Sequence, residues 1–340
     1  MNDLERAAVF AQTNDARGNE LVAFTRDADG RLVNAGSYPT GGRGDGKPHL
    51  PSQGSIAIDD SRRRLLLANA GSDELSLFSI GGLPQLLSHV ASGGERPVSI
   101  AIRGDRVYVL NAGNATIVGF VLEGDSIRPL AGTLRALAEG SDPAQIAFTP
   151  AGDALVITDR ATNSIIVYRL DEQGLPSGLE TYAAAGVTPY GFDFSGDVLV
   201  VTEAFGGQVG AAAASSYTVG GGELRPVSSS VGSTRSEVCW AIASADGRYV
   251  WMTNFGDGTI SRYAVGGDGS LELADAVAAA TVEGMKGVRD AARSSDGRFF
   301  YALDADAHRV FAYRVADEGT LEAIGSANGL PGTVAGLAAV

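Results

Sequence analysis

The sequence repeats one short apolar segment seven times, and this repeat leaves few folds open to the chain. The copies are Ser55–Ile58, Ser99–Ile102, Gln145–Phe148, Gly191–Phe194, Trp240–Ala243, Arg289–Ala292 and Gly336–Ala339. Successive copies begin 44 to 49 residues apart, a spacing typical of a four-stranded propeller blade. Two domains would be the simple expectation for 340 residues. The repeat instead predicts one propeller of seven blades.

A second pattern supplies the other strands of each blade. Eight to ten residues after most copies comes an apolar run that ends in a polar turn, as in Leu65–Gly71 and Val107–Gly113. Runs with a period of two follow the turn, as in Ser164–Tyr168, and pairs such as Asp246-Gly247 are hairpin turns. We therefore predict an all-β chain of four-stranded blades with negligible helix.

The two ends of the chain complement each other. The N-terminal copy of the second run, Ala8–Asn14, has no apolar segment before it, whereas the last apolar segment has nothing after it. Pairing the C-terminal strand with the N-terminal blade closes the ring and removes open sheet edges. We expect a single domain over residues 1–340, with blades that start near 55, 99, 145, 191, 240 and 289 and a closing blade made of 6–52 plus 333–340.

Charge and cysteine content exclude several function classes. Forty acidic and 26 basic residues give a net charge of −14, which disfavours nucleic acid as a partner. The single cysteine, Cys239, cannot form an internal disulfide or a cysteine-rich zinc site, and a buried inert thiol is expected there. No leader-like N-terminus or apolar stretch of membrane length is present. We expect a cytoplasmic protein that binds no membrane, and the oligomeric state stays open.

Three segments carry a resemblance to a known family. Leu67–Ser72, Val200–Gly207, and Trp240 followed by Asp246–Tyr249 resemble the bacterial lactonase-family propellers, which include 6-phosphogluconolactonase-type and carboxymuconate-lactonizing proteins. The resemblance spans nearly the whole chain and implies a seven-bladed fold and lactone chemistry. It implies no particular catalytic residue. The stretch 254–260 is also similar to the repeats of YVTN-type propellers, which implies a non-enzymatic binding function instead.

The candidate site residues lie on one predicted face. Loops that enter the inner strands and loops that join the second and third strands of each blade share this face. The sequence has its longest blades at 191 and 240, so we expect an eccentric site there. The predicted catalytic residues are Glu203 and His49, and the predicted substrate-binding residues are Arg235, Arg289, Lys286, Glu237, Trp240 and Tyr190.

These residue types point to a small anionic molecule as the partner. Arginine offers a planar fork suited to carboxylate or phosphate, and Arg235 and Arg289 would orient the substrate and stabilise an oxyanion. Glu203, or His49 in a glycine-rich loop, would activate water or move a proton. Ring opening or ring closing of a lactone is the predicted reaction.

Structural roles compete with each of these assignments. The charged residues could form ion pairs that only hold the loops, and Trp240 could simply pack the channel. Asn69, Asn111 and Asn254 recur at one turn position, where an asparagine side chain bonds nearby backbone. The alternative is a ring of oxygen ligands for Ca²⁺. We predict no metal and no cofactor, with Ca²⁺ as the alternative.

Overall fold

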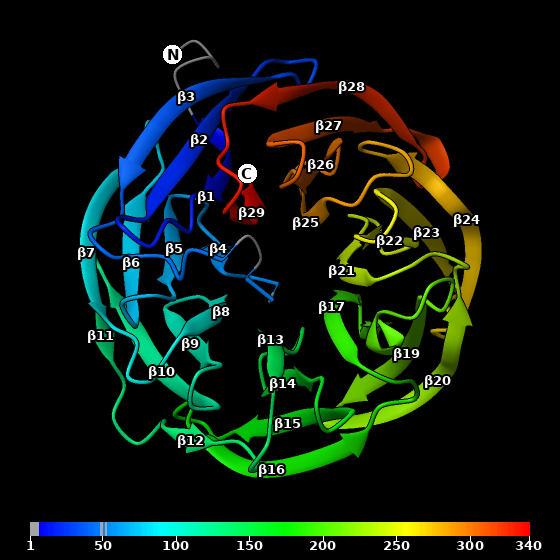
Figure 1. The fold of residues 1–340 in the computed structure, drawn as a ribbon. Coiled ribbons are helices and arrows are strands. Elements are labelled where there is room, and N and C mark those ends of the chain that lie inside the picture. Colours follow the sequence, from blue (N-terminus) through cyan, green and yellow to red (C-terminus); the bar gives the residue numbers. More distant parts are fainter. Residues whose placement is uncertain (1–6, 48–49, 52) are drawn as a thin grey trace.

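The computed structural model describes residues 7–47, 50–51 and 53–340. Seven antiparallel sheets stand around a central channel, which confirms the predicted seven-bladed β-propeller (Figure 1). Each blade runs from an inner strand at the channel to an outer strand at the rim. Within the described residues the helical content is two short 3₁₀ turns, Phe205–Gly207 and Asp317–Gly319. None of the helices described has the length and apolar character of a membrane span.

The strands of the first four blades follow in chain order. Blade 1 contains β4 (Ile56–Ile58), β5 (Arg64–Asn69), β6 (Glu74–Ser79) and β7 (Gln85–Ala91); blade 2 contains β8 (Pro97–Arg103), β9 (Arg106–Asn111), β10 (Thr116–Glu123), β11 (Ser126–Pro129) and β12 (Arg135–Ala136). Blade 3 contains β13 (Pro143–Phe148), β14 (Ala154–Asp159), β15 (Ser164–Leu170) and β16 (Pro176–Ala183); blade 4 contains β17 (Pro189–Ser195), β18 (Val198–Glu203), β19 (Ala213–Gly220) and β20 (Glu223–Gly232).

The remaining three blades complete the ring. Blade 5 contains β21 (Val238–Ala243), β22 (Tyr249–Asn254), β23 (Thr259–Val265) and β24 (Leu271–Ala280); blade 6 contains β25 (Val288–Arg293), β26 (Phe299–Asp304), β27 (Arg309–Val315) and β28 (Leu321–Asn328). Blade 7 contains β29 (Ala335–Ala339), β1 (Ala7–Gln12), β2 (Glu20–Arg26) and β3 (Leu32–Pro39). Among the described residues, only blade 2 departs from four strands. Its outer strand is split into β11 and β12, which both pair with β10.

The closure predicted from the two chain ends is confirmed. β29 pairs with β1 in antiparallel register, with Phe10 opposite Ala338 and Ala11 opposite Leu337. The C-terminal strand is therefore the inner strand of the blade that begins the chain.

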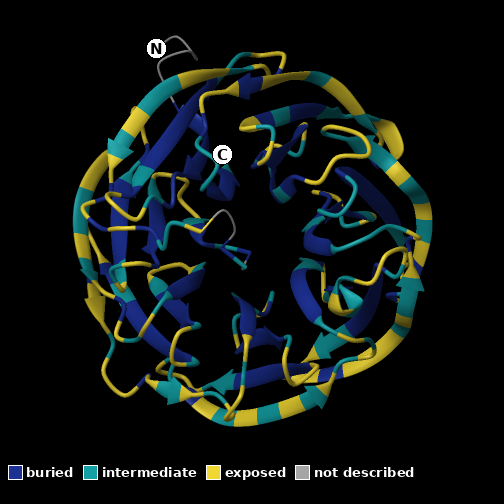
Figure 2. Ribbon diagram, in the orientation of Figure 1, coloured by how far each residue is buried: buried dark blue, intermediate teal, exposed yellow. Residues whose placement is uncertain are grey.

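The core lies in the seams between neighbouring blades. Alternating side chains on the two middle strands of a blade pack against the next blade, as where Val9 and Phe24 of blade 7 contact Phe299 and Tyr301 of blade 6. Figure 2 shows the inner and middle strands buried and the outer strands banded with exposed residues. This gradient matches strands that read as apolar runs near the channel and alternate at the rim.

Polar side chains link the inner strands to one another. The Gln145 carboxamide exchanges two hydrogen bonds with the backbone of Phe192, which joins blade 3 to blade 4. The Gln53 carboxamide makes the same pair of bonds with Ala241 of blade 5. The segment before blade 1 thus enters the channel, with Leu50 buried against inner strands of blades 2 and 3.

Candidate functional site

Three of the predicted binding residues meet in one pocket on the face of the entry loops. A cavity of about 370 Å³ lies between blades 4, 5 and 6 and is lined by Arg235, Glu237 and Lys286, as well as by Asp257. Val209 and Gly210, from the long loop after β18, form another part of its wall. The site is eccentric, at the two blades whose length departs from the repeat.

Each cation that lines this pocket is paired with a carboxylate. The Lys286 Nζ lies 2.8 Å from the Glu237 Oε1, and the Arg235 Nη1 lies 3.9 Å from the Asp257 Oδ2. All four side chains keep between 26% and 56% of their surface exposed. Exposed pairs of this kind contribute little to stability, so their cations can exchange a protein carboxylate for a ligand anion at small cost.

Arg289 joins this group through the ring of Phe255. The Arg289 guanidinium carbon lies 4.4 Å from the ring centroid, and the Lys286 Nζ lies 5.4 Å from it. Arg289 also pairs with Asp306 at 3.3 Å. The Nε–H groups of Arg235 and Arg289 are buried and find no acceptor within the described part of the chain. Each of these two arginines therefore has one buried N–H group whose hydrogen bond is unmade within the described residues.

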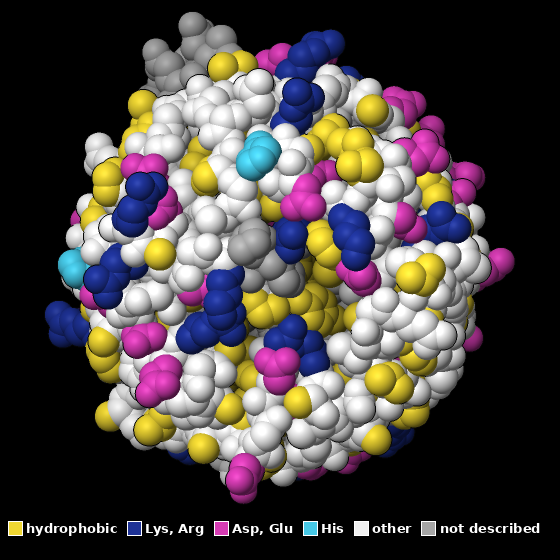
Figure 3. All heavy atoms as spheres, viewed as in Figure 1, with side chains coloured by type: hydrophobic (Ala, Val, Ile, Leu, Met, Phe, Trp, Pro, Cys, Tyr) yellow, Lys and Arg dark blue, Asp and Glu magenta, His cyan; other side chains and the backbone are white. Residues whose placement is uncertain are grey.

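Tyr190 and Trp240 form an aromatic floor beside Phe255. Their rings stack at 4.7 Å with an interplanar angle of 10°, and the two residues form one buried cluster with Ala144 and Cys239 against which Phe255 packs. Burial raises the pKa of Cys239 to about 12, so this thiol stays protonated and fits the expected inert role. Figure 3 shows Lys and Arg side chains around a central hollow with an apolar floor.

Glu203 lies apart from the pocket. It ends β18 and is fully buried, and its two carboxyl oxygens accept hydrogen bonds from the Ser215 and Ser230 hydroxyls of the outer strands. Burial raises the pKa of Glu203, although these bonds oppose the shift. The carboxyl group is therefore turned toward the rim. Glu203, predicted as a catalytic residue, is not among the residues that line the pocket.

His49 lies outside the described residues, and its role stays a prediction. The recurrent turn position, in contrast, is well described. The Asn69 and Asn254 amides donate to the Ser76 and Ser261 hydroxyls of the neighbouring strands, which supports a structural role for these asparagines. Over the described ranges no group of three His, Cys, Asp or Glu residues is arranged to hold a metal ion.

The left-handed backbone conformation of Glu237 is a feature of the blade repeat. Glu237 has a φ of 53°, a left-handed conformation that is uncommon outside glycine. Arg96 and Thr188 hold the same position before their own inner strands, with φ of 53° and 59°. Because the conformation recurs where the chain enters a blade, it is no evidence for function at Glu237.

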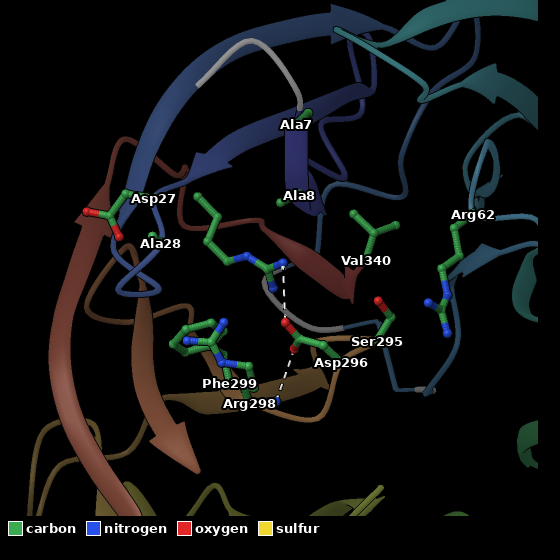
Figure 4. Close-up of a pocket in the computed structure, with 11 residues that line it drawn as sticks. Ala7, Ala8, Asp27, Ala28, Arg62, Ser295, Asp296, Arg298, Phe299 and Val340 are labelled. Atoms are coloured by element: carbon green, nitrogen blue, oxygen red, sulfur yellow. Dashed lines mark hydrogen bonds and ion pairs between the residues drawn. The ribbon is translucent and has the colours of Figure 1, made fainter. Parts of the chain in front are cut away.

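A second cavity opens on the opposite face. It measures about 390 Å³ and lies at the closure of the ring. Figure 4 shows Asp296 and Phe299 on one side of it and Arg62 on the other. Asp296 accepts a hydrogen bond from the Arg298 backbone at 3.0 Å. None of the predicted site residues within the described chain lines this cavity, and we assign no function to it.

Sequence reasoning missed Phe255, Asp257 and Asp306. Phe255 follows the recurrent turn position, where blades 1, 2, 4 and 6 carry alanine. An aromatic residue at a position of small residues is a departure from the repeat, and this signal could have identified it. Asp257 and Asp306 lie in turns rich in polar residues, and nothing in the sequence separates them from other turn aspartates.

Comparisons with known proteins agree with this architecture. A family model described as a lactonase with a seven-bladed β-propeller matches residues 124–209 and 198–335. No curated protein sequence matches the chain.

Solved structures align over almost the whole length. A protein from Lactobacillus plantarum has a TM-score of 0.76 at 16% identity, covering 98% of each chain. A protein from Bacteroides uniformis, provisionally assigned as a 6-phosphogluconolactonase, has a TM-score of 0.76 at 17% identity, covering 97% of this chain and 99% of that one. The periplasmic gluconolactonase of Pseudomonas aeruginosa has a TM-score of 0.73 at 17% identity, covering 97% and 98%. At these identities the likeness shows the fold alone.

Proposed function

This chain belongs to the family of seven-bladed β-propeller lactonases, and from this premise we propose that it hydrolyses a small anionic lactone in the pocket formed by Arg235, Glu237 and Lys286. The proposal draws on the neighbours described as a 6-phosphogluconolactonase and a gluconolactonase. A lactone that carries a carboxylate or phosphate fits the chemistry of this pocket best.

The observation that carries the proposal is the gathering of three cations at and beside one cavity of an acidic protein. Arg235 and Lys286 line the 370 Å³ pocket. Arg289 lies over the Phe255 ring, which Lys286 also approaches. The Nε–H groups of the two arginines are buried and have no acceptor within the described structure. Donors on a planar guanidinium suit an oxygen anion, because two parallel bonds can form. The net charge of −14 makes this local concentration of cations the natural place for an anion.

The pocket also contains the groups that ring opening requires. A water oxygen attacks the lactone carbonyl carbon, the bond from that carbon to the ring oxygen breaks, and the ring oxygen takes up a proton to give a hydroxy acid. In our proposal Lys286 and Arg289 bind the anionic substituent and Arg235 stabilises the oxyanion. Glu237, released from Lys286 when the substrate binds, accepts the proton from water. Ring closing is the reverse of these steps.

The other predicted residues take supporting places in this scheme. Tyr190 and Trp240 belong to the buried cluster against which Phe255 packs, and in our proposal this cluster keeps water from that side of the substrate. Glu203 ties the end of β18 to β19 and β20 through its two serine bonds. A carboxyl group engaged in this way is poorly placed to activate water. His49 is the second candidate for the proton acceptor.

Hydrolysis of a phosphorylated sugar lactone, followed by base uptake at constant pH, tests the proposal. We expect Glu237→Gln to lower kcat by about a hundredfold, the lower range for a lost general base, with the thermal unfolding temperature unchanged. Arg225→Gln, at the exposed rim on β20, is the matched control and should keep full activity. Equal rates for Glu237→Gln and wild type would remove Glu237 from the mechanism.

The non-enzymatic alternative has its own outcome in this experiment. Binding of the hydroxy acid measured by calorimetry, without any turnover of the lactone, would make the chain a ligand-binding propeller that uses the same pocket.

A further inference from the structure

A third cavity, unrelated to the proposed lactone pocket, lies at the outer part of blades 2 and 3. It measures about 520 Å³ and is lined mainly by apolar side chains, among them Leu137, Ile166, Tyr168 and Leu179. One end is polar and contains Asp159 and Thr162. The cavity lies where β12 faces β15 and β16, beside the split outer strand of blade 2 (Figure 1). An apolar pocket of this size with one polar end is the usual form of a small-molecule site.

Asp159 is unusual among the residues at the recurrent turn position. Its Oδ1 accepts hydrogen bonds from the backbone N–H groups of Asp142, Ala161 and Thr162. Its Oδ2 is buried and has no hydrogen-bond partner within the described residues. Leaving a buried carboxylate oxygen without a hydrogen-bond donor costs free energy. A ligand that supplies this donor would therefore gain binding free energy.

The repeat explains why this oxygen lacks a partner. In blades 1, 4 and 5 the residue two positions along the next strand is a serine. The Ser215 hydroxyl donates to the Glu203 carboxylate, whereas the Ser76 and Ser261 hydroxyls accept from the amides of Asn69 and Asn254. In blade 3 the register places Ile166 at that position. Ile166 has no donor, and its side chain forms part of the apolar wall of the cavity.

The other carboxyl groups at this position are fully partnered. Glu203 accepts from Ser215 and Ser230, whereas Asp304 accepts from the Thr281 hydroxyl and the Ala307 N–H. Two asparagines, Asn111 and Asn254, also leave an oxygen unpaired, but an amide is neutral and neither residue lines this cavity. Asp159 alone combines a negative charge, an unpaired oxygen and a cavity within the described chain.

We propose that this cavity binds a small amphipathic amine, with its ammonium group beside the Asp159 Oδ2 and its apolar body against Ile166, Tyr168 and Leu179. The ammonium supplies both the missing hydrogen bond and the opposite charge. Because Oδ2 is covered from bulk water, the attraction is weakly screened. The site shares no lining residue with the lactone pocket, and the proposal does not depend on lactonase activity.

Calorimetric titration of the whole protein with hexylamine tests this site, with hexanol, hexanoate and Nα-acetyl-lysine methylamide as parallel probes. We expect hexylamine to bind at least tenfold more tightly than hexanol, and hexanoate not to bind. Capped lysine carries the same ammonium on a polar body, so it should bind more weakly than hexylamine. Equal binding of the capped lysine would overturn the apolar part of the proposal, and an absence of hexylamine binding would overturn it altogether.

Two variants locate the binding. Asp159→Asn keeps the turn, since asparagine occupies this position in three other blades, and should weaken hexylamine at least tenfold. Ile166→Ser restores the hydroxyl found in blades 1, 4 and 5 and should have the same effect by giving Oδ2 an internal donor. Asp304→Asn is the matched control in blade 6 and should bind hexylamine like wild type. Undiminished binding by a folded Asp159→Asn variant would exclude this cavity as the site.

Discussion

Gln53 and Ala241 are joined by two hydrogen bonds although they belong to opposite sides of the ring. The Gln53 Nε2 donates to the Ala241 carbonyl at 2.8 Å, and the Ala241 N–H donates to the Gln53 Oε1 at 3.2 Å. β4 and β21 lie on opposite sides of the channel in Figure 1. One side chain thus bridges the channel beside the aromatic floor of the site, where Gly191 approaches both Gln53 and Trp240.

Replacing this bridge should weaken the fold. Gln53→Ala leaves two backbone groups of Ala241 without their partner, and such a loss costs about 1–3 kcal/mol for each buried group. For the two groups together we expect the free energy of unfolding in urea to fall by about 2–6 kcal/mol. Gln145→Ala removes the same pair of bonds between adjacent blades and provides the comparison. A Gln53→Ala variant as stable as wild type would mean that the bridge does not hold the channel together.

Closure of the ring should depend on the C-terminal strand. Deleting residues 333–340 removes β29, exposes the inner edge of β1 and takes Leu337 from the core cluster that joins blades 6 and 7. We expect the thermal unfolding temperature to collapse, with aggregation through the open strand edges. Calorimetry of the truncated chain checks this. Thermal unfolding like that of the full chain would refute the role of the closure.

The calcium alternative gives a simple prediction. An ion that binds only the folded state stabilises it by mass action, so a chelator would lower the thermal unfolding temperature of a Ca²⁺-dependent propeller. We expect no change on addition of EDTA. A clear decrease that Ca²⁺ reverses would make the ring of oxygen ligands the better model.

Asp290 should make the protein less stable as the pH rises. Burial in β25 raises the pKa of Asp290 well above its usual value, although bonds from the Ala291 and Leu337 backbone oppose the shift. In the unfolded chain this carboxyl group ionises near pH 4. Above that pH the unfolded state has lost a proton that the folded state keeps, so the free energy of unfolding falls by up to about 1.4 kcal/mol per pH unit until the folded pKa is reached.

Asp290→Asn removes this dependence. The variant keeps an oxygen to accept the Ala291 N–H bond and has no charge to bury. We expect its thermal unfolding temperature to exceed that of wild type at pH 7 and the difference to shrink toward pH 4. Asp246→Asn is the opposite control, because hydrogen bonds lower the pKa of Asp246 to about 2 and its stabilisation is lost as the pH falls. A difference for Asp290→Asn that is constant with pH would contradict the assignment.

The fold could be predicted from the sequence because each blade repeats the same strand pattern. The intervals between the apolar segments identified seven blades, and the incomplete copies at the two ends identified the pairing of β29 with β1. The extra strand β12 was not predictable, since the two-residue pairing of Arg135 and Ala136 with β10 leaves no periodic signal.

The site was predictable only in part, for a physical reason. Loop position follows from the repeat, and it brought Arg235, Glu237 and Lys286 into one pocket. Side-chain direction does not follow from the repeat. The Glu203 carboxyl group turns toward the rim because Ser215 and Ser230 offer it two donors there. This orientation depends on the exact bounds of the outer strands, which the repeat gives only approximately.

One comparison tests the central claim most directly. It is the preference for a phosphorylated sugar lactone over the same lactone without phosphate, measured as the ratio of the two kcat/KM values in wild type and in Arg289→Gln. Our account predicts that wild type prefers the phosphorylated lactone and that Arg289→Gln reduces this preference by about tenfold, the effect of one lost charged hydrogen bond, through a higher KM with little change in kcat. Turnover of the neutral lactone should stay the same. A preference that is absent in wild type, or that survives in a folded Arg289→Gln variant, would contradict the account.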